Sequence, residues 1–352
     1  MLIPEVKEID NTNNNNVTKP YKKYNYFVNN KPSKSSIANW IIITVLFLNI
    51  VLWLVSKFVY GDSFATWYKY IAKISSLTGT LMMAVTILTS IKNIYLEKMF
   101  GGLDKQYNIH RQYGKLSFVV LLFHPIFLGI HSLATGGINA LMQFASLDVG
   151  SMYDQGRVLG YICFDVLVIL IAISIYKKVE YQLWLLTHKL FVPLYILVLI
   201  HLYLVMGDIF KYPIFTIWYL TLSILPLLIL LVNYISKAMH FHQFEGVVKS
   251  VGLHAGADVV RVEIELSSIL DLRDFRAGQF AFFKFKGINN GWHPFSIALI
   301  EENRVILGIK NLGNYTSKVK DLSVGSKVSI DGYYGGLSNS IPKNKEIGRA
   351  HV

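Results

Sequence analysis

The chain has 352 residues, of which 53% are hydrophobic and 16% are charged. Soluble domains carry about 25% charged residues, so this composition excludes an ordinary soluble protein and indicates membrane-spanning segments. The formal net charge is +12, but the basic residues lie between the apolar runs and in the tails, which favours membrane topology over nucleic-acid binding. The single cysteine, Cys163, excludes a disulfide within the chain and a CxxC metal site.

Residues 1–36 are polar and contain an asparagine run from Asn13 to Asn16 together with several lysines. This composition is typical of a disordered basic tail, which we expect on the cytoplasmic side. Because the tail is long and polar, and no small-residue cleavage site follows, we expect the first apolar run to be a retained helix.

Six apolar segments follow, each near the ~20 residues that a helix needs to cross a bilayer. We therefore predict a multi-pass, six-helix membrane domain over residues 37–236. The expected spans are Ile37–Phe58, Ile71–Ile91, Leu116–His131, Val158–Ile175, Leu186–Val205 and Ile214–Ile235. The connections at 92–115 and 177–189 are rich in lysine and arginine, whereas 132–155 has neither. By the positive-inside rule, both termini are expected in the cytoplasm and the protein in the plasma (cytoplasmic) membrane.

Four histidines are the candidate metal ligands: His110 just before the third span, His124 within it, and His188 and His201 in the fifth span. His110 and His124 are fourteen positions apart, which places them within about 40° of one helix face and about 21 Å apart along its axis. His188 and His201 lie on the fifth span, which runs in the same direction. We therefore predict two pairs at two depths, His110 with His188 and His124 with His201. Each pair of imidazoles closes both axial positions of a haem iron.

The fifth span does not repeat the spacing of the third. Its histidines are thirteen positions apart, which rotates a straight helix by about 220°. Pro193 lies between them and lacks an amide donor, so we expect a kink there. His131 follows His124 by seven positions, and two roles fit it: it poises an external acceptor or a proton, or it is an interfacial residue that ends the span.

The character of the sequence changes after Lys237. Apolar and polar residues alternate at Val259–Leu266, Gln279–Phe285 and Arg304–Lys310, and glycine-containing turns separate these runs. Alternation with a period of two is typical of strands with one buried face. We predict a small antiparallel β-barrel over residues 241–335, on the cytoplasmic side of the membrane.

The histidine spacings, His-x13-His followed by His-x12-His, resemble those of the ferric reductase and NADPH oxidase superfamily. In the second domain, His293-Pro-Phe-Ser296 resembles that family's flavin motif, and Gly278-Gln-Phe280 precedes it as expected. Lys310–Thr316 is similar to the family's flavin-phosphate segment, and Asp331–Gly335 is similar to the turn that closes its FAD barrel.

The resemblance covers about Ile71 to Gly335. The amino-acid sequence around Leu183–Gly207 and Ala277–Ser296 is similar to that of bacterial NADPH oxidases in particular. It implies two b-type haems in the helical bundle and FAD in a barrel of the ferredoxin-reductase type. The implied FAD contacts are Gln279, Phe280, His293, Pro294, Phe295, Ser296, Lys310, Gly313 and Thr316. Phe295 and Ser296 offer a ring face and a hydroxyl to the flavin, and Gly313 permits close approach of the pyrophosphate to backbone amides and Thr316.

The resemblance implies transmembrane electron transfer from cytoplasmic NAD(P)H, through FAD and two haems, to an external acceptor. The likeness to bacterial oxidases favours O2, which would give superoxide; ferric or cupric chelates and quinones also fit closed bis-histidine haems. A haem-binding subunit that relays electrons to a partner protein is an alternative, and a histidine-lined proton or ion pathway is another. No residue is expected to act as an acid–base catalyst.

Residues 336–352 depart from the family pattern, because no glycine-rich nucleotide-binding segment follows the barrel. The last six residues, Ile347–Val352, back-translate into the opening of a common sequencing adapter. We expect this tail to be an artefact, and the natural chain to continue into an NAD(P)-binding domain.

Overall fold

The computed structural model describes residues 33–63, 66–176, 178–239, 243–253, 258–267, 279–288, 291–301 and 303–335. Most of the predicted basic tail, Gly278 of the flavin motif and the tail at 336–352 lie outside these residues.

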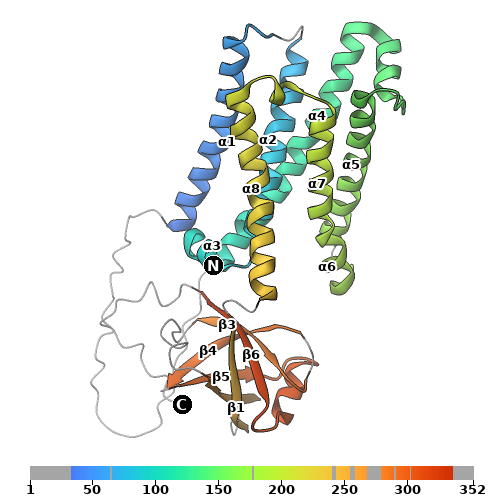
Figure 1. The fold of residues 1–352 in the computed structure, drawn as a ribbon. Coiled ribbons are helices and arrows are strands. Elements are labelled where there is room, and N and C mark those ends of the chain that lie inside the picture. The colour runs from blue at the N-terminus through green and yellow to red at the C-terminus, as the bar shows by residue number, and fades with distance from the viewer. Residues whose placement is uncertain are drawn as a thin grey trace, which may run out of the picture. The chain divides into compact units, whose positions relative to one another are not determined.

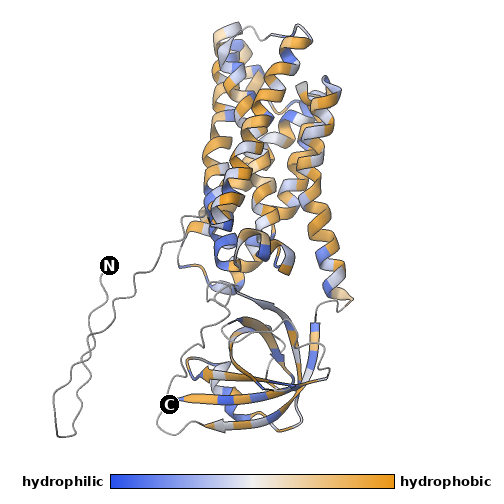
Figure 2. Ribbon diagram, turned by 90° about the vertical axis from the view of Figure 1, so that its left-hand side faces the viewer, coloured by the Kyte–Doolittle hydropathy of each residue, from blue (hydrophilic) through white to orange (hydrophobic). Residues whose placement is uncertain are grey.

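Within the described residues, six helices or helix pairs are long and apolar enough to cross a membrane, which confirms the predicted number of spans. They are α1 (Lys34–Val59), α2 (Trp67–Ser90), α4 (Leu103–Ala145), α5 (Met152–Ile175), the pair α6 (Tyr181–Lys189) and α7 (Phe191–Leu204), and α8 (Pro213–Ala238) (Figure 1). Short helices α3 (Ile94–Phe100) and η1 (Asp208–Phe210) lie in connections. Hydrophobic residues cover the long helices along most of their length (Figure 2).

Helix α4 is much longer than the predicted span Leu116–His131, and this corrects the sequence-based bounds. Its first turns are polar but helical, so hydropathy alone does not detect them. They bring His110 into the same helix as His124. Near its other end the helix is kinked at Gly137, whose φ of 64° is a left-handed conformation that favours glycine.

The fifth span breaks at Leu190, between α6 and α7. Pro193 has no amide hydrogen, so the helical bond to the carbonyl four residues earlier cannot form. At the break itself, the amide of Leu190 donates to the carbonyl of Thr187, three residues earlier, at 3.0 Å. The kink expected from Pro193 is therefore confirmed.

The long helices pack in two groups. Helix α4 packs along α2, which also packs against α8, whereas α7 packs along α5. Side chains of α2, among them Met83 and Ile87, join a buried cluster with Leu167 of α5 and Tyr195 of α7. The helices that carry the paired histidines, α4 on one side and α6 and α7 on the other, thus belong to different groups.

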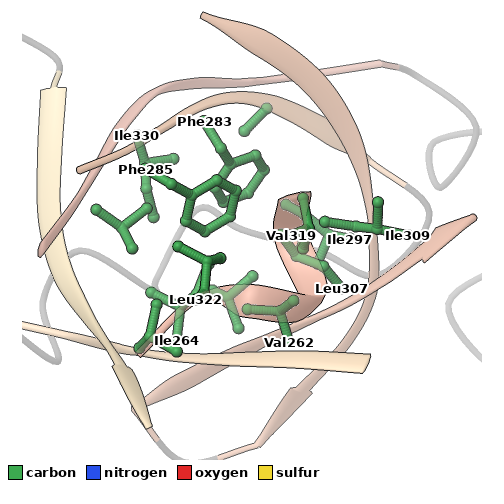
Figure 3. Close-up of a cluster of buried hydrophobic side chains, with 14 of the residues drawn as sticks. Val262, Ile264, Phe283, Phe285, Ile297, Leu307, Ile309, Val319, Leu322 and Ile330 are labelled. Atoms are coloured by element: carbon green, nitrogen blue, oxygen red, sulfur yellow. The ribbon is translucent and has the colours of Figure 1, made fainter. Parts of the chain in front are cut away.

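The described residues after the last span form a closed antiparallel barrel with the strand order β1-β2-β5-β4-β3-β6. Its strands are β1 (Gln243–Leu253), β2 (Val259–Leu266), β3 (Phe280–Phe285), β4 (His293–Glu301), β5 (Arg304–Lys310) and β6 (Lys327–Tyr334), and the 3-10 helix η3 spans Thr316–Asp321. On β2 the buried Val262 and Ile264 alternate with outward-facing Arg261 and Glu263, and aromatic and aliphatic side chains fill the interior (Figure 3). The predicted barrel is confirmed.

Candidate functional site

The first histidine pair is His110, near the start of α4, and His188, near the end of α6. The ring centroids of His110 and His188 are 6.0 Å apart. Nδ1 of His110 lies 2.8 Å from the carbonyl oxygen of Thr86 on α2, and Nδ1 of His188 lies 3.3 Å from Oγ of Ser174 on α5. A carbonyl oxygen only accepts, so Nδ1 of His110 carries the proton and Nε2 keeps its lone pair for a metal. The ring of His188 also stacks on Trp184, with centroids 4.8 Å apart.

The second pair, His124 and His201, lines one cavity of about 280 Å³. A single water needs only about 10–15 Å³ by this measure, so the cavity is far larger than a packing defect. Nδ1 of His124 lies 2.9 Å from the carbonyl of Ala72, and Nδ1 of His201 lies 2.7 Å from that of Gly156. Both imidazoles therefore keep Nε2 available.

A glycine makes room for the imidazole of His201. A Cβ built on Gly160 of α5 would lie 2.6 Å from Cε1 of His201, which is closer than a real Cβ approaches any heavy atom. A methyl group at this position would therefore displace the imidazole.

This donor set fits haem better than a bare metal ion. Among the described residues there is no group of three or more histidine, cysteine, aspartate or glutamate side chains that could hold a metal. Two facing imidazoles suffice where a porphyrin supplies the remaining nitrogen ligands. The bundle brings the four histidines together in the two pairs expected from their depths, while their ligand roles stay predictions.

His131 lies further along α4, and its Nδ1 is 2.8 Å from Oγ1 of Thr66, the residue before α2. This contact joins α4 to the residue that precedes α2, and α4 continues past His131 to Ala145. Both roles considered for His131, toward an external acceptor or a proton and as an interfacial residue, stay predictions.

Three cationic side chains that the sequence reasoning did not single out also line the cavity of His124 and His201: Lys69 and Lys73 of α2 and Arg157 of α5. No carboxylate is among the described residues of that lining. Arg157 is fixed in place, because its guanidinium donates to the carbonyls of Gln143, Phe144 and Ser146 and pairs with Asp154 at 3.0 Å. In the sequence, Lys69 and Lys73 stand just before or within the first turn of the apolar run Ile71–Ile91, and this position is the signal that could have indicated them.

The predicted flavin motif forms the start of β4. Ser296 is exposed and pairs across the sheet with Phe280 of β3. The ring of Phe295 instead faces the barrel core, where its centroid lies 6.1 Å from that of Phe283. The imidazole of His293 is half-buried rather than projecting, and stacks on Tyr315 with centroids 3.5 Å apart. Of the motif's side chains, Pro294 and Ser296 are thus the accessible ones.

The predicted phosphate segment forms a tight turn before η3. Oγ1 of Thr316 accepts from the amides of Leu312 and Gly313, at 2.9 and 3.0 Å. These two amides are therefore engaged by the turn itself. Lys310 and Gly313 are exposed, and their proposed contact with a flavin phosphate stays a prediction.

The segment Asp331–Gly335 lies at the end of β6 rather than in a separate turn. Asp331 is buried, and its Oδ2 pairs with Nζ of Lys92, which follows α2, at 2.8 Å. The amide of Gly335 donates to Oε1 of Glu97 on α3 at 2.8 Å. Burial lowers the pKa of Lys92 and raises the pKa of Glu97 from their ordinary values. The barrel's last strand is thus joined to Lys92, just after α2, and to Glu97 of α3.

Comparison with known proteins adds two family matches. Residues 75–199 match the family described as ferric reductase like transmembrane component, and residues 247–341 match an FAD-binding domain family. Among curated proteins, none matches the chain significantly in sequence.

Two solved structures show distant likenesses. One is a ferredoxin reductase in carbazole 1,9a-dioxygenase, with 18% identity and a TM-score of 0.23, covering 27% of this chain and 29% of that one. Another is the flavohemoglobin from Malassezia yamatoensis with bound FAD and heme, with 14% identity and a TM-score of 0.25, covering 77% of this chain and 62% of that one. The chain spans less than two thirds of either relative, and TM-scores this low carry no argument.

Proposed function

The chain belongs to the ferric reductase and NADPH oxidase superfamily, and we propose that it carries electrons from cytoplasmic NAD(P)H to an acceptor outside the membrane. The two matched domains make it a membrane oxidoreductase of the flavocytochrome type. NAD(P)H would reach the flavin through a nucleotide-binding domain that associates with the barrel. We place both termini in the cytoplasm and the bundle in the plasma membrane, on the basis of the charge bias of the connections.

The proposal rests mainly on the hydrogen bonds that hold the imidazoles in place. Three of the four Nδ1 atoms, in His110, His124 and His201, lie against backbone carbonyls of neighbouring helices. Such bonds fix the tautomer and the ring orientation, and they increase the basicity of Nε2 as a ligand. Histidines that only pack between membrane helices would not need such a hydrogen bond in both pairs. We assign one b-type haem to His110 and His188 and one to His124 and His201.

When bound, haem iron supplies single-electron transfer and FAD supplies the exchange between hydride and single electrons. The protein's own residues hold and insulate these groups. The carbonyls of Thr86, Ala72 and Gly156 orient the imidazoles. Apolar side chains such as Leu121 and Leu194 line the cavity. In the barrel, the exposed hydroxyl of Ser296 and the neighbouring Gln279, Phe280 and Pro294 form the surface proposed for the flavin ring.

We propose O2 as the acceptor, which would be reduced to superoxide. The proposal draws on the likeness to bacterial oxidases at Leu183–Gly207 and Ala277–Ser296. An anionic ferric or cupric chelate is the second candidate, because Lys69, Lys73 and Arg157 line the cavity without a carboxylate. Positive charge there attracts an anionic acceptor. It also stabilises the superoxide anion relative to neutral O2, and so favours the reduction of O2.

Sealed vesicles containing the purified protein test electron transfer across the membrane. With ferricyanide trapped inside and dithionite added outside, we expect the trapped ferricyanide to be reduced, and a His110→Ala variant to lose this activity. Absence of reduction in the wild-type vesicles would refute the proposal. The acceptor is then identified by mixing the pre-reduced protein with O2 or with ferric citrate and comparing the rates of reoxidation.

A further inference from the structure

Asp165 is a carboxylate in the middle of the membrane-spanning helix α5. The helix runs from Met152 to Ile175, and its most apolar window has a mean hydropathy of 2.6. The side chain of Asp165 is exposed, and it forms no hydrogen bond or ion pair with any residue that the structure describes. An ionisable group at such a depth is rare, and it is normally paired or turned to the bundle interior.

Two contacts fix the depth of Asp165. The carbonyl of Gly156 lies against His201, and Oγ of Ser174 lies against His188. Asp165 is nine residues from each, or about 13.5 Å along the helix axis. It therefore lies midway between the two histidine levels, at the centre of the membrane rather than near an interface.

The same two contacts fix the direction in which Asp165 points. Nine residues rotate a helix by about 900°, which is two full turns and a half. Asp165 therefore lies on the opposite side of α5 from Gly156 and Ser174, which face α7 and α6. The exposed residues Ile162 and Ile169 share its face, and α5 lies at the edge of the bundle (Figure 1). The carboxylate is turned toward the membrane and away from the cavity.

We propose that this face of α5 docks against the same face of a second copy of the chain, with the two Asp165 side chains opposite each other. A two-fold axis along the membrane normal places identical residues at identical depth. A carboxyl group can donate a hydrogen bond through its hydroxyl and accept one through its carbonyl oxygen, so two copies of Asp165 satisfy each other. The exposed Ala172, one turn past Ile169, leaves room for close approach of the helices.

A basic partner on the second copy fits less well. Among the exposed residues of the described spans, Lys115 of α4 is the basic side chain nearest to this depth. It is five residues from His110, or about 7.5 Å from that histidine level against about 13.5 Å for Asp165. Long lysine side chains also extend toward the nearer interface. The difference in depth therefore favours the pairing of Asp165 with itself over its pairing with Lys115.

Cysteine cross-linking in membranes tests the contact without reference to any cofactor. The natural Cys163 is buried and should not cross-link, so Ile169→Cys can be introduced into the otherwise unchanged full chain. On mild oxidation we expect a covalent dimer from Ile169→Cys, and none from Phe164→Cys, whose position lines the cavity. Adding Asp165→Leu should reduce the Ile169→Cys dimer at least fivefold, whereas Asp165→Asn, which still donates and accepts, should retain it.

The outcomes separate the possibilities. No dimer from Ile169→Cys would overturn the proposal, and so would a dimer insensitive to Asp165→Leu. Equal loss in Asp165→Asn and Asp165→Leu would exclude the hydrogen-bonded pair. Elution of every variant as a single species in detergent verifies that loss of the dimer is not loss of the fold.

Discussion

His110 and His188 lie with their ring centroids 6.0 Å apart, although they come from helices that pack in different groups of the bundle. Each ring contacts a further helix through its Nδ1 atom. Nδ1 of His110 lies against the carbonyl of Thr86 on α2, and Nδ1 of His188 lies against Oγ of Ser174 on α5. The two rings meet edge to face, at an interplanar angle of 64°, and nothing in the pair itself would hold them in this arrangement. The support from neighbouring helices is what makes a ligand site the simplest account of the arrangement.

Replacement of His201 by alanine should remove the outer haem and leave the inner one, because the two pairs share no side chain. The haem content of the purified variant, measured as pyridine haemochrome per polypeptide, should fall by half. His131→Ala is the matched control and should retain the full content, since its contact is with Thr66. Equal loss in both variants would refute the assignment.

Gly160→Ala should disturb the outer site without touching a proposed ligand. The added Cβ would lie 2.6 Å from the imidazole of His201, and overpacking of this kind costs about 1–3 kcal/mol. We expect an altered low-spin signal, or lower haem content, in electron paramagnetic resonance spectra. Gly114→Ala is the control, because its Cβ would lie in ordinary contact with Thr86, at 3.7 Å. A normal spectrum for Gly160→Ala would contradict the account.

The flavin motif should divide into a core residue and a surface residue. Phe295 packs against the barrel core, so Phe295→Ala should destabilise the barrel by about 3–5 kcal/mol and lower its unfolding temperature. Ser296 is exposed, so Ser296→Ala should leave that temperature unchanged while shifting the absorption or potential of added FAD. A stable barrel in Phe295→Ala would show that its ring is not a core residue.

Glu97 should make the stability of the protein depend on pH. Burial raises the pKa of Glu97 above its ordinary value of 4.5, so the folded state holds this proton over a pH range in which the unfolded chain has lost it. Its contribution is therefore fully present below pH 4.5 and is lost as the pH rises through the folded-state pKa. Glu97→Gln keeps an acceptor for the amide of Gly335 and removes the titration.

We therefore expect Glu97→Gln to gain stability relative to the wild type as the pH is raised from 4.5 toward neutrality, in thermal unfolding curves. Glu301→Gln, at an exposed carboxylate, serves as the control and should show no such trend. A difference between Glu97→Gln and wild type that stays constant with pH would argue against a buried, titrating Glu97.

The sequence was sufficient for the six spans and the barrel, because hydropathy and a period of two are local signals. Depth along co-directional spans also predicted which histidines meet. The carbonyl anchors at Thr86, Ala72 and Gly156 could not be predicted, since they depend on how separate helices pack. The same holds for Phe295: its motif indicated flavin binding, but strand register turns its ring into the core. The sequence shows Asp165 as an acidic residue within an apolar run. Only the contacts of Gly156 and Ser174 show that it lies on the side of α5 that faces away from α6 and α7.

The haem content of the wild-type protein tests the central claim most directly. The full chain, produced with haem available and purified, should contain two b-type haems per polypeptide by pyridine haemochrome and protein assay. The dithionite-reduced minus oxidised spectrum should show only low-spin, bis-histidine absorption. A colourless protein, or one with a single haem that survives both His110→Ala and His124→Ala, would contradict the account.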